Sequence, residues 1–211
     1  MSDDLLAYVS VLRLSRHDVK VLKITDAYSL HKQVYGLFED VRSNADKNDG
    51  ASSGILWADK GGDFNHRHVL MLSNRKPHQT PQFGEVETRI IKPSFVQHDR
   101  YGFEIKLNPS KRNKQTGKVE AIRKRDDIAL WAIERAHKSW GFEILPDHLQ
   151  VTINPALQFV KNGQTVTHNS AHLKGELRVT DRSAFIDSFL HGIGRGKTFG
   201  FGLLQIIPLN H

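Results

Sequence analysis

The chain has 211 residues, enough for one large domain or two small ones with a substantial core. With 38% hydrophobic and 25% charged residues it reads as a soluble globular protein, and no apolar run approaches the roughly 20 residues that span a bilayer. The absence of cysteine excludes disulfides and thiolate metal sites, and the net charge of +7 favours a polyanionic partner. The acidic start, Met1–Asp4, lacks the basic residues of a signal peptide, so a cytoplasmic protein without a membrane partner is expected.

The first half of the chain is predicted to carry one amphipathic helix among strands. A hydroxyl N-cap at Thr25 and apolar residues at helical spacing predict a helix over residues 26–39. Beside its apolar stripe, Tyr28, His31 and Tyr35 form a second stripe at the flank. Alternating or β-rich patterns predict strands over residues 5–14, 54–58, 68–72, 86–91 and 101–107, with a polar surface loop over 43–54 and an irregular stretch over 77–84.

The second half opens with the strongest charge bias in the chain. Two helices are predicted, over residues 126–140 after the acidic pair Asp126–Asp127 and over residues 180–190. Strands are predicted over residues 142–145, 149–154, 157–160, 171–179 and 203–208. The basic residues within 108–125 are Lys111, Arg112, Lys114, Lys118, Arg123, Lys124 and Arg125, with Glu120 the only acid.

The order of these elements predicts an α+β fold of two tandem ferredoxin-like (RRM-like) domains with a C-terminal glycine-rich loop. No sequence repeat supports the duplication, so the prediction depends on element order alone. The expected domains are residues 1–109 with the 26–39 helix, a basic connecting segment over 110–125, and residues 126–211 with the glycine-rich loop.

Residues 191–203 contain five of the sixteen glycines of the chain, and an apolar strand follows them. Glycine permits sharp turns and close approach of a partner, and Arg195 and Lys197 add positive charge between Gly194, Gly196 and Gly200. This combination suits a bound phosphate backbone. The loop precedes a strand and matches neither the P-loop nor the dinucleotide signature, and a strained turn remains the alternative.

The spacing of Tyr28 and His31 could serve acid–base chemistry, because residues three apart on a helix face the same side. Free histidine titrates near about 6.5 and can donate or accept a proton, whereas tyrosine mostly donates or orients. RNA carries its own nucleophile, the 2′-hydroxyl, so a His, a Tyr and a nearby cation could supply what strand cleavage needs. The alternative is that both are ordinary boundary residues. No metal or cofactor is expected, because His66 and His68 lack an evident third ligand.

Several motifs together resemble the CasE family, the endoribonucleases that process CRISPR RNA in type I-E systems. They are Tyr28-x-x-His31, the strand end at Asn108, the basic segment leading into Trp131, and the terminal run from Gly192 to Leu204. The resemblance implies tandem ferredoxin-like domains and metal-independent cleavage at the base of a repeat hairpin, leaving a 2′,3′-cyclic phosphate and a 5′-hydroxyl.

By the same resemblance, Tyr28 and His31 match the catalytic pair and Lys197 matches the lysine of the glycine-rich loop. Residues 111–125 match the family's RNA-binding basic region. The expected partners are CRISPR repeat hairpin RNA and other subunits of a Cascade-like effector complex, in which the product would be retained. A family lysine near the scissile phosphate has no clear counterpart, and Lys161 and Lys174 are the nearest candidates.

Two other functions remain open at this stage. A non-catalytic guide-RNA-binding subunit of the same complex would keep the basic segment and the loop but use Tyr28 and His31 only for packing. An α/β enzyme acting on a small nucleotide is disfavoured, because the glycine-rich loop enters a strand and no ribose-binding acid follows at dinucleotide spacing.

Overall fold

The computed structural model describes residues 4–43, 52–161 and 163–209. The chain divides into two compact units. The first unit runs to Pro93 and also contains Thr198–Gly200, and the second contains Ser94–Lys197 and the residues from Phe201 onwards. A short stretch of the predicted glycine-rich loop therefore belongs to the N-terminal unit.

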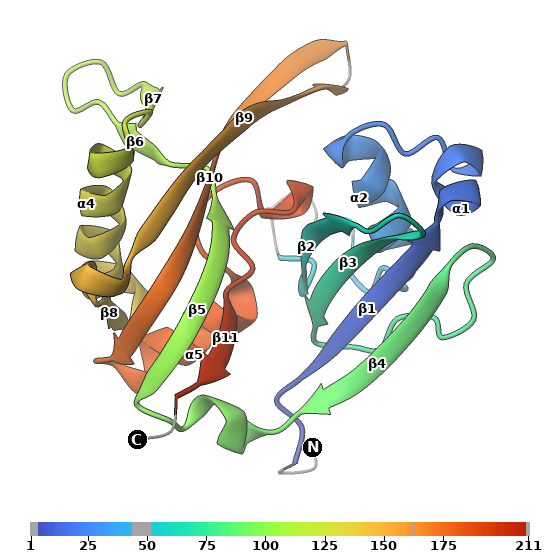
Figure 1. Cartoon of the computed structure of the whole chain (residues 1–211), viewed down its shortest axis with the longest axis horizontal. Helices are drawn as coiled ribbons and strands as arrows, with labels where there is room; N and C mark the ends of the chain where they lie inside the picture. Colours follow the sequence, from blue (N-terminus) through green and yellow to red (C-terminus); the bar gives the residue numbers. More distant parts are fainter. Residues whose placement is uncertain (1–3, 44–51, 162, 210–211) are drawn as a thin grey trace. The chain divides into compact units, whose positions relative to one another are not determined.

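The first unit is a four-stranded antiparallel sheet in the order β2-β3-β1-β4 (Figure 1). At its centre Leu12 lies opposite Val69 on one side and Val86 on the other, so these apolar side chains share one face of the sheet. The strands are β1 Ala7–Ser15, β2 Ile55–Gly62, β3 His66–Ser73 and β4 Glu85–Ile91.

Two helices, α1 Arg16–Val21 and α2 Ala27–Gly36, connect β1 to β2. Both begin with a capping box, at Ser15 for α1 and at Asp26 for α2, which supplies partners for the first free backbone N–H groups. The helices and the sheet enclose one apolar cluster, made of Leu12, Leu14, Ile24, Leu30, Val34, Leu37, Phe38, Ile55, Trp57, Val69 and Met71.

The second unit repeats this arrangement with its own sheet, in the order β11-β5-β10-β8. Numbered along the chain with β9 set aside, the second sheet has the order 4-1-3-2, which is the 2-3-1-4 order of the first sheet seen from the opposite edge and is the ferredoxin-like order. The long β9 pairs with β10, and their hairpin extends beyond the register of β5 (Figure 1). The strands are β5 Arg100–Leu107, β8 Phe142–Ile144, β9 Gln150–Lys161, β10 Gln164–Val179 and β11 Gln205–Pro208.

Helices lead into two strands of the second sheet. Helix α4, Arg125–Arg135, continues through a π-helical turn at Ala136–Trp140 into β8, and α5, Arg182–His191, connects β10 to β11. The first unit differs at the place corresponding to α5: residues 74–84, between β3 and β4, form no helix. Despite this difference, the strand order that the two sheets share confirms the prediction of tandem ferredoxin-like domains.

The predicted domain boundary near residue 109 differs from the structure. Residues 100–107 were expected to complete the first half, but β5 is a central strand of the second sheet, paired with β10 and β11. The boundary between the units falls at Pro93 and Ser94, and the basic segment lies inside the second unit. The pattern of β5 predicts a strand but cannot specify its partners, which come much later in the chain.

Smaller differences concern the ends of elements. The first predicted helix is capped by Asp26 instead of Thr25, and it ends at Gly36 instead of residue 39. Helix α1 was not predicted, and the two strands expected over 149–160 form the single strand β9. Residues 44–51 of the predicted polar loop lie outside the described residues.

Candidate active site and nucleic-acid interface

The orientation of α2 follows from its cap and its buried stripe. The Asp26 carboxylate accepts a hydrogen bond from the Ser29 backbone nitrogen at 2.7 Å, and the Asp26 nitrogen donates to the Ser29 hydroxyl at 3.0 Å. Leu30 and Val34 are buried in the core of the first unit. Because residues 28, 31 and 35 lie beside that stripe, their side chains sit where the helix meets the solvent.

The rings of Tyr28, His31 and Tyr35 form a continuous row on this edge of α2. The centroids of Tyr28 and His31 are 6.2 Å apart with nearly parallel planes, and those of His31 and Tyr35 are 4.2 Å apart. The Tyr35 hydroxyl is 3.0 Å from the Ser53 hydroxyl, which fixes the far end of the row. All three aromatic residues are half-buried, and the Nδ1 atom of the His31 imidazole is fully buried.

A cation missed by the sequence analysis accompanies this row. The Lys32 ammonium lies 4.6 Å from the centroid of the Tyr28 ring, a cation–π contact. Lys32 follows His31 directly and stands four residues after Tyr28, so helical spacing was the signal that could have found it. An imidazole, a phenol and an ammonium therefore occur together on one exposed edge of a helix.

Residues Thr198–Gly200 complete the surroundings of His31 within the first unit. The buried indole of Trp57 donates a hydrogen bond to the Thr198 carbonyl oxygen at 3.1 Å. Gly200 adopts φ +81°, and a Cβ there would lie 2.8 Å from the Trp57 ring, so only glycine fits. Between these two anchors, the Phe199 ring lies 5.8 Å from the His31 ring. Sequence reasoning did not single out Phe199 or Trp57.

The rest of the glycine-rich loop is held by the second unit. The Ile193 nitrogen donates to the Gly202 carbonyl at 2.9 Å, and the Gly202 nitrogen donates to the Lys106 carbonyl at 2.8 Å. Gly196 packs against the Phe201 ring, where an added Cβ would lie 3.0 Å from it. These hydrogen bonds and this packing give the loop a defined path over the end of β5.

The predicted RNA-binding residues of the loop differ in their surroundings. Gly194 and Arg195 are exposed, so the Arg195 guanidinium faces solvent. Lys197 is half-buried, and its ammonium donates to the His191 carbonyl at 2.9 Å, at the C-terminal end of α5. A cation there also interacts favourably with the helix dipole, so Lys197 has a structural role in addition to any contact with RNA.

The predicted basic segment forms a small antiparallel hairpin within the second unit. Strand β6, Ser110–Arg112, pairs with β7, Val119–Ala121, and the Arg112 guanidinium donates to the Gly117 carbonyl at 2.7 Å. The structure brings four of the predicted cations onto this hairpin and places three directly after it, at the start of α4. All seven are exposed: Lys111, Arg112, Lys114, Lys118, Arg123, Lys124 and Arg125.

A half-buried histidine lies beneath the glycine-rich loop in the second unit. His168 Nδ1 is 2.8 Å from the Asn108 side-chain nitrogen, and its ring meets Phe201 edge-on at 5.7 Å. Burial lowers the pKa of His168 below its ordinary value, which favours the neutral imidazole. Of the two lysines considered for the second unit, Lys174 is exposed on β10, and the side chain of Lys161 lies outside the described set.

Within residues 4–43, 52–161 and 163–209, no three histidine, aspartate or glutamate side chains gather closely enough to hold a metal ion. The rings of His66 and His68 lie 6.3 Å apart on β3. The helices of the same described ranges include none with the length and apolar character required to cross a membrane.

Two ferredoxin-like units and a glycine-rich loop define a tandem ferredoxin-like protein. A family model described as "CRISPR associated protein" matches residues 7–208. The chain belongs to these CRISPR-associated proteins, in the CasE family that its motifs resemble.

Individual relatives agree with this assignment. The chain is 24% identical over 196 residues to the CRISPR system Cascade subunit CasE of Escherichia coli, covering 87% of this chain and 93% of that one. It is 26% identical over 126 residues to the CRISPR-associated endoribonuclease Cse3 of Thermus thermophilus, a match that spans 55% of this chain and only 59% of the relative. A solved structure of CRISPR endoribonuclease Cse3 bound to a 19 nt RNA superposes with a TM-score of 0.79 at 20% identity, covering 96% of this chain and 99% of that chain.

Proposed function

We propose that this protein is a metal-independent endoribonuclease that cleaves CRISPR repeat RNA beside a hairpin, in the cytoplasm. The observation that carries the proposal is the half-buried pair Tyr28 and His31 on one edge of α2, with the Lys32 ammonium over the phenol ring. The names of the Cse3 and CasE relatives, one an endoribonuclease and the other a Cascade subunit, support the same function.

The proposed reaction is an internal transesterification at one phosphodiester. The neutral imidazole of His31 accepts the proton of the ribose 2′-hydroxyl while the 2′-oxygen forms a bond to phosphorus. The bond from phosphorus to the 5′-oxygen breaks, and the Tyr28 hydroxyl donates a proton to that leaving oxygen. Lys32 stabilises the additional negative charge on the phosphorane. The products are a 2′,3′-cyclic phosphate and a 5′-hydroxyl, and every step uses side chains and RNA alone.

The exposed cations of the β6–β7 hairpin support binding of the RNA stem. The major groove of A-form RNA is too deep and narrow for side chains to read bases, so phosphates are the accessible targets of a cationic hairpin. Arg195 and the backbone of Gly194 and Gly196 are proposed as further contacts to the RNA backbone. Retention of the product on these cations would make the protein a lasting subunit of a Cascade-like complex.

Cleavage of repeat RNA in excess EDTA tests the mechanism. The wild-type protein is expected to cut without added metal, and His31→Ala is expected to cut at least several hundredfold more slowly, because one acid–base group is worth about 10²–10⁴ in rate. His137→Ala, which removes an exposed histidine of the π-helical turn, is the matched control and should keep the wild-type rate. An RNA with 2′-deoxyribose at the scissile nucleotide should bind and stay intact. A requirement for metal, or full activity in His31→Ala, would refute this mechanism.

A non-catalytic guide-RNA-binding subunit is the second candidate. The contact of His31 with both Tyr35 and Phe199 favours it, because aromatic neighbours on two sides are also what a packing residue needs. The two functions share RNA binding and differ in cleavage, so intact RNA after prolonged incubation with the wild-type protein would favour the second.

A further inference from the structure

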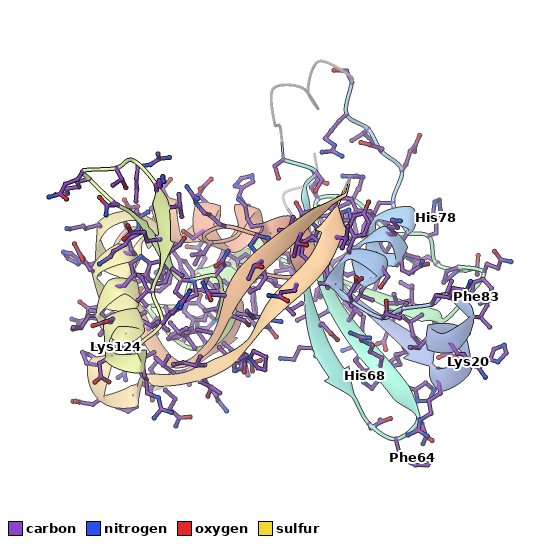
Figure 2. The ribbon with its side chains drawn as sticks, turned by 90° about the horizontal axis from the view of Figure 1, so that it is seen from above. Lys20, Phe64, His68, His78, Phe83 and Lys124 are labelled. Carbon is purple, nitrogen blue, oxygen red and sulfur yellow. The ribbon has the colours of Figure 1, made fainter. Side chains whose placement is uncertain are left out.

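A second aromatic surface of the first unit lies at the tip of the β2–β3 hairpin. Phe64 is 76% exposed there, although large apolar side chains are usually buried. The turn that presents it is well defined, because the Asp63 carboxylate accepts hydrogen bonds from the backbone nitrogens of Asn65 and His66, both at 2.7 Å. Figure 2 shows Phe64 at the end of this hairpin, with His68 further along it.

One face of the Phe64 ring is covered by a cation. The Arg16 guanidinium lies 4.0 Å from the ring centroid, and Arg16 is the first residue of α1, whose start is fixed by the capping box of Ser15 and Asp18. In the described part of the chain, no carboxylate forms an ion pair with Arg16. The guanidinium can therefore bind an external anion while it remains stacked on the ring.

Arg16 also lines a cavity of about 410 Å³, a size within the range of small-ligand sites. Its carboxylates are already satisfied: Asp59 pairs with Arg67 at 2.6 Å, and backbone N–H groups of the tip turn lower the pKa of Asp63. Gly61 leaves its rim open, since an added Cβ would meet no atom within 4 Å. The cavity is lined by Leu14, Arg16, Val19, Asp59, Gly61, Gly62, Asp63, His66 and Arg67.

We infer that this tip is a binding site for single-stranded RNA, in which an unpaired base stacks on Phe64 and Arg16 contacts the adjoining phosphate. Base–aromatic stacking tolerates any sequence, and only an unpaired base can expose its face to such a ring. His66 and His68 on β3 add polar groups beside this tip, with their rings 6.3 Å apart. The ligand would be the single-stranded RNA that flanks the repeat stem.

The inference builds on the proposed function for its ligand, and the two can be tested separately. Fluorescence anisotropy would measure the Kd of the full chain for the repeat stem-loop alone and for the same stem-loop with single-stranded extensions at both ends. The wild-type protein is expected to bind the extended RNA more tightly. Phe64→Ala should weaken binding of the extended RNA about 5- to 100-fold, the range for removal of one stacked base, and leave binding of the stem-loop unchanged.

Two further variants sharpen the result. Phe64→Trp should retain the tighter binding because it keeps an aromatic face, and Arg16→Gln should reduce the slope of log affinity against log salt by about one for the extended RNA. Ile207→Ala removes a comparably exposed apolar side chain, 71% exposed, in the second unit and should change neither Kd.

Specific outcomes would overturn the inference. Equal binding of the two RNAs by the wild-type protein would do so, as would weaker binding of both RNAs by Phe64→Ala. If Phe64→Ala bound RNA normally but no longer co-purified with other effector subunits, the tip would be a protein contact and the inference would be wrong. Cleavage of the extended RNA at saturating protein continues in each of these cases, whereas failure of the proposed function removes cleavage itself.

Discussion

The Phe199 ring lies 5.8 Å from the imidazole of His31, tilted by 58°, although the two residues come from opposite ends of the sequence. The phenyl group limits the positions that the imidazole can occupy on the edge of α2. If His31 transfers a proton during cleavage, its orientation depends on a residue that has no chemistry of its own.

Removal of this ring is expected to slow cleavage without abolishing it. In Phe199→Ala the imidazole loses a neighbour that restrains it, and small misplacements of a catalytic group cost on the order of 10–100-fold in rate. The cleavage rate of Phe199→Leu should lie between those of Phe199→Ala and the wild-type protein, because leucine restores part of the packing. Single-turnover cleavage of the extended repeat RNA measures the effect, and Ile207→Ala, which removes an exposed apolar side chain of the second unit, serves as the control. A wild-type rate in Phe199→Ala would show that the ring is dispensable.

Substitution of Gly200 is expected to cost more stability than substitution of another glycine with the same backbone. Gly200 and Gly163 have φ of +81° and +74°, but an added Cβ meets the Trp57 ring only at Gly200. Gly163→Ala should cost about 1–2 kcal/mol for the left-handed conformation, and Gly200→Ala about 1–3 kcal/mol more for the clash. Urea unfolding of both variants measures the difference. Equal costs would contradict the packing of Gly200 on Trp57.

Stability is expected to fall in mild acid because of His168. Its folded-state pKa is lowered by burial, so near and below the ordinary value of about 6.5 the unfolded chain binds more protons than the folded one. The stabilisation is complete above that value and is lost as the pH falls through it. In His168→Gln the urea unfolding midpoint should depend less on pH between about pH 7.5 and about pH 5.5. An unchanged pH dependence in that variant would assign the effect to other groups.

Carboxylates account for a separate decrease in stability at lower pH. The pKa of Glu87 is lowered by hydrogen bonds from Arg13 and Arg89, and that of Asp18 by the Ser15 hydroxyl. Their stabilisation is present above the ordinary carboxylate values and disappears as the pH falls below them. In Glu87→Gln the urea unfolding midpoint should therefore decrease less as the pH falls through about 4. The separate decrease of the midpoint near about pH 6.5 should be the same as in the wild-type protein.

The salt dependence of RNA binding is expected to report the cations of the β6–β7 hairpin. Removal of one cation that binds a phosphate, for example in Lys118→Ala, should reduce the slope of log affinity against log salt by about one. Lys138→Ala is the control, since that ammonium pairs with Glu134 at 2.5 Å on the surface of the second unit. Equal slopes for Lys118→Ala and Lys138→Ala would show that Lys118 does not bind an RNA phosphate.

Local patterns in the sequence predicted most elements but not their partners. The alternation in residues 100–107 predicted a strand, yet its neighbours β10 and β11 follow long after it, so it was given to the first half instead of the second. Helix α1 could have been found from Ser15 and Asp18, which have the spacing of a capping box. The strand β9 was predicted in two pieces because Pro155 interrupts its pattern.

The candidate site was predictable only as far as it lies on one helix. Tyr28 and His31 follow from helical spacing, and Lys32 could have been added by the same rule. Phe199 could not, because its position beside His31 depends on the hydrogen bond between Trp57 and Thr198, which joins residues 141 positions apart. No local period encodes such a pairing.

The membership of Thr198–Gly200 in the first unit has a consequence for biosynthesis. A ribosome makes His31 and Trp57 long before Phe199, because strands β5 to β10 of the second unit are synthesised in between. A chain that stops before Phe199 therefore has α2 without the phenyl group that packs on the imidazole. The packed His31 exists only in a chain that extends past Phe199, so a shorter product cannot present this arrangement to cellular RNA.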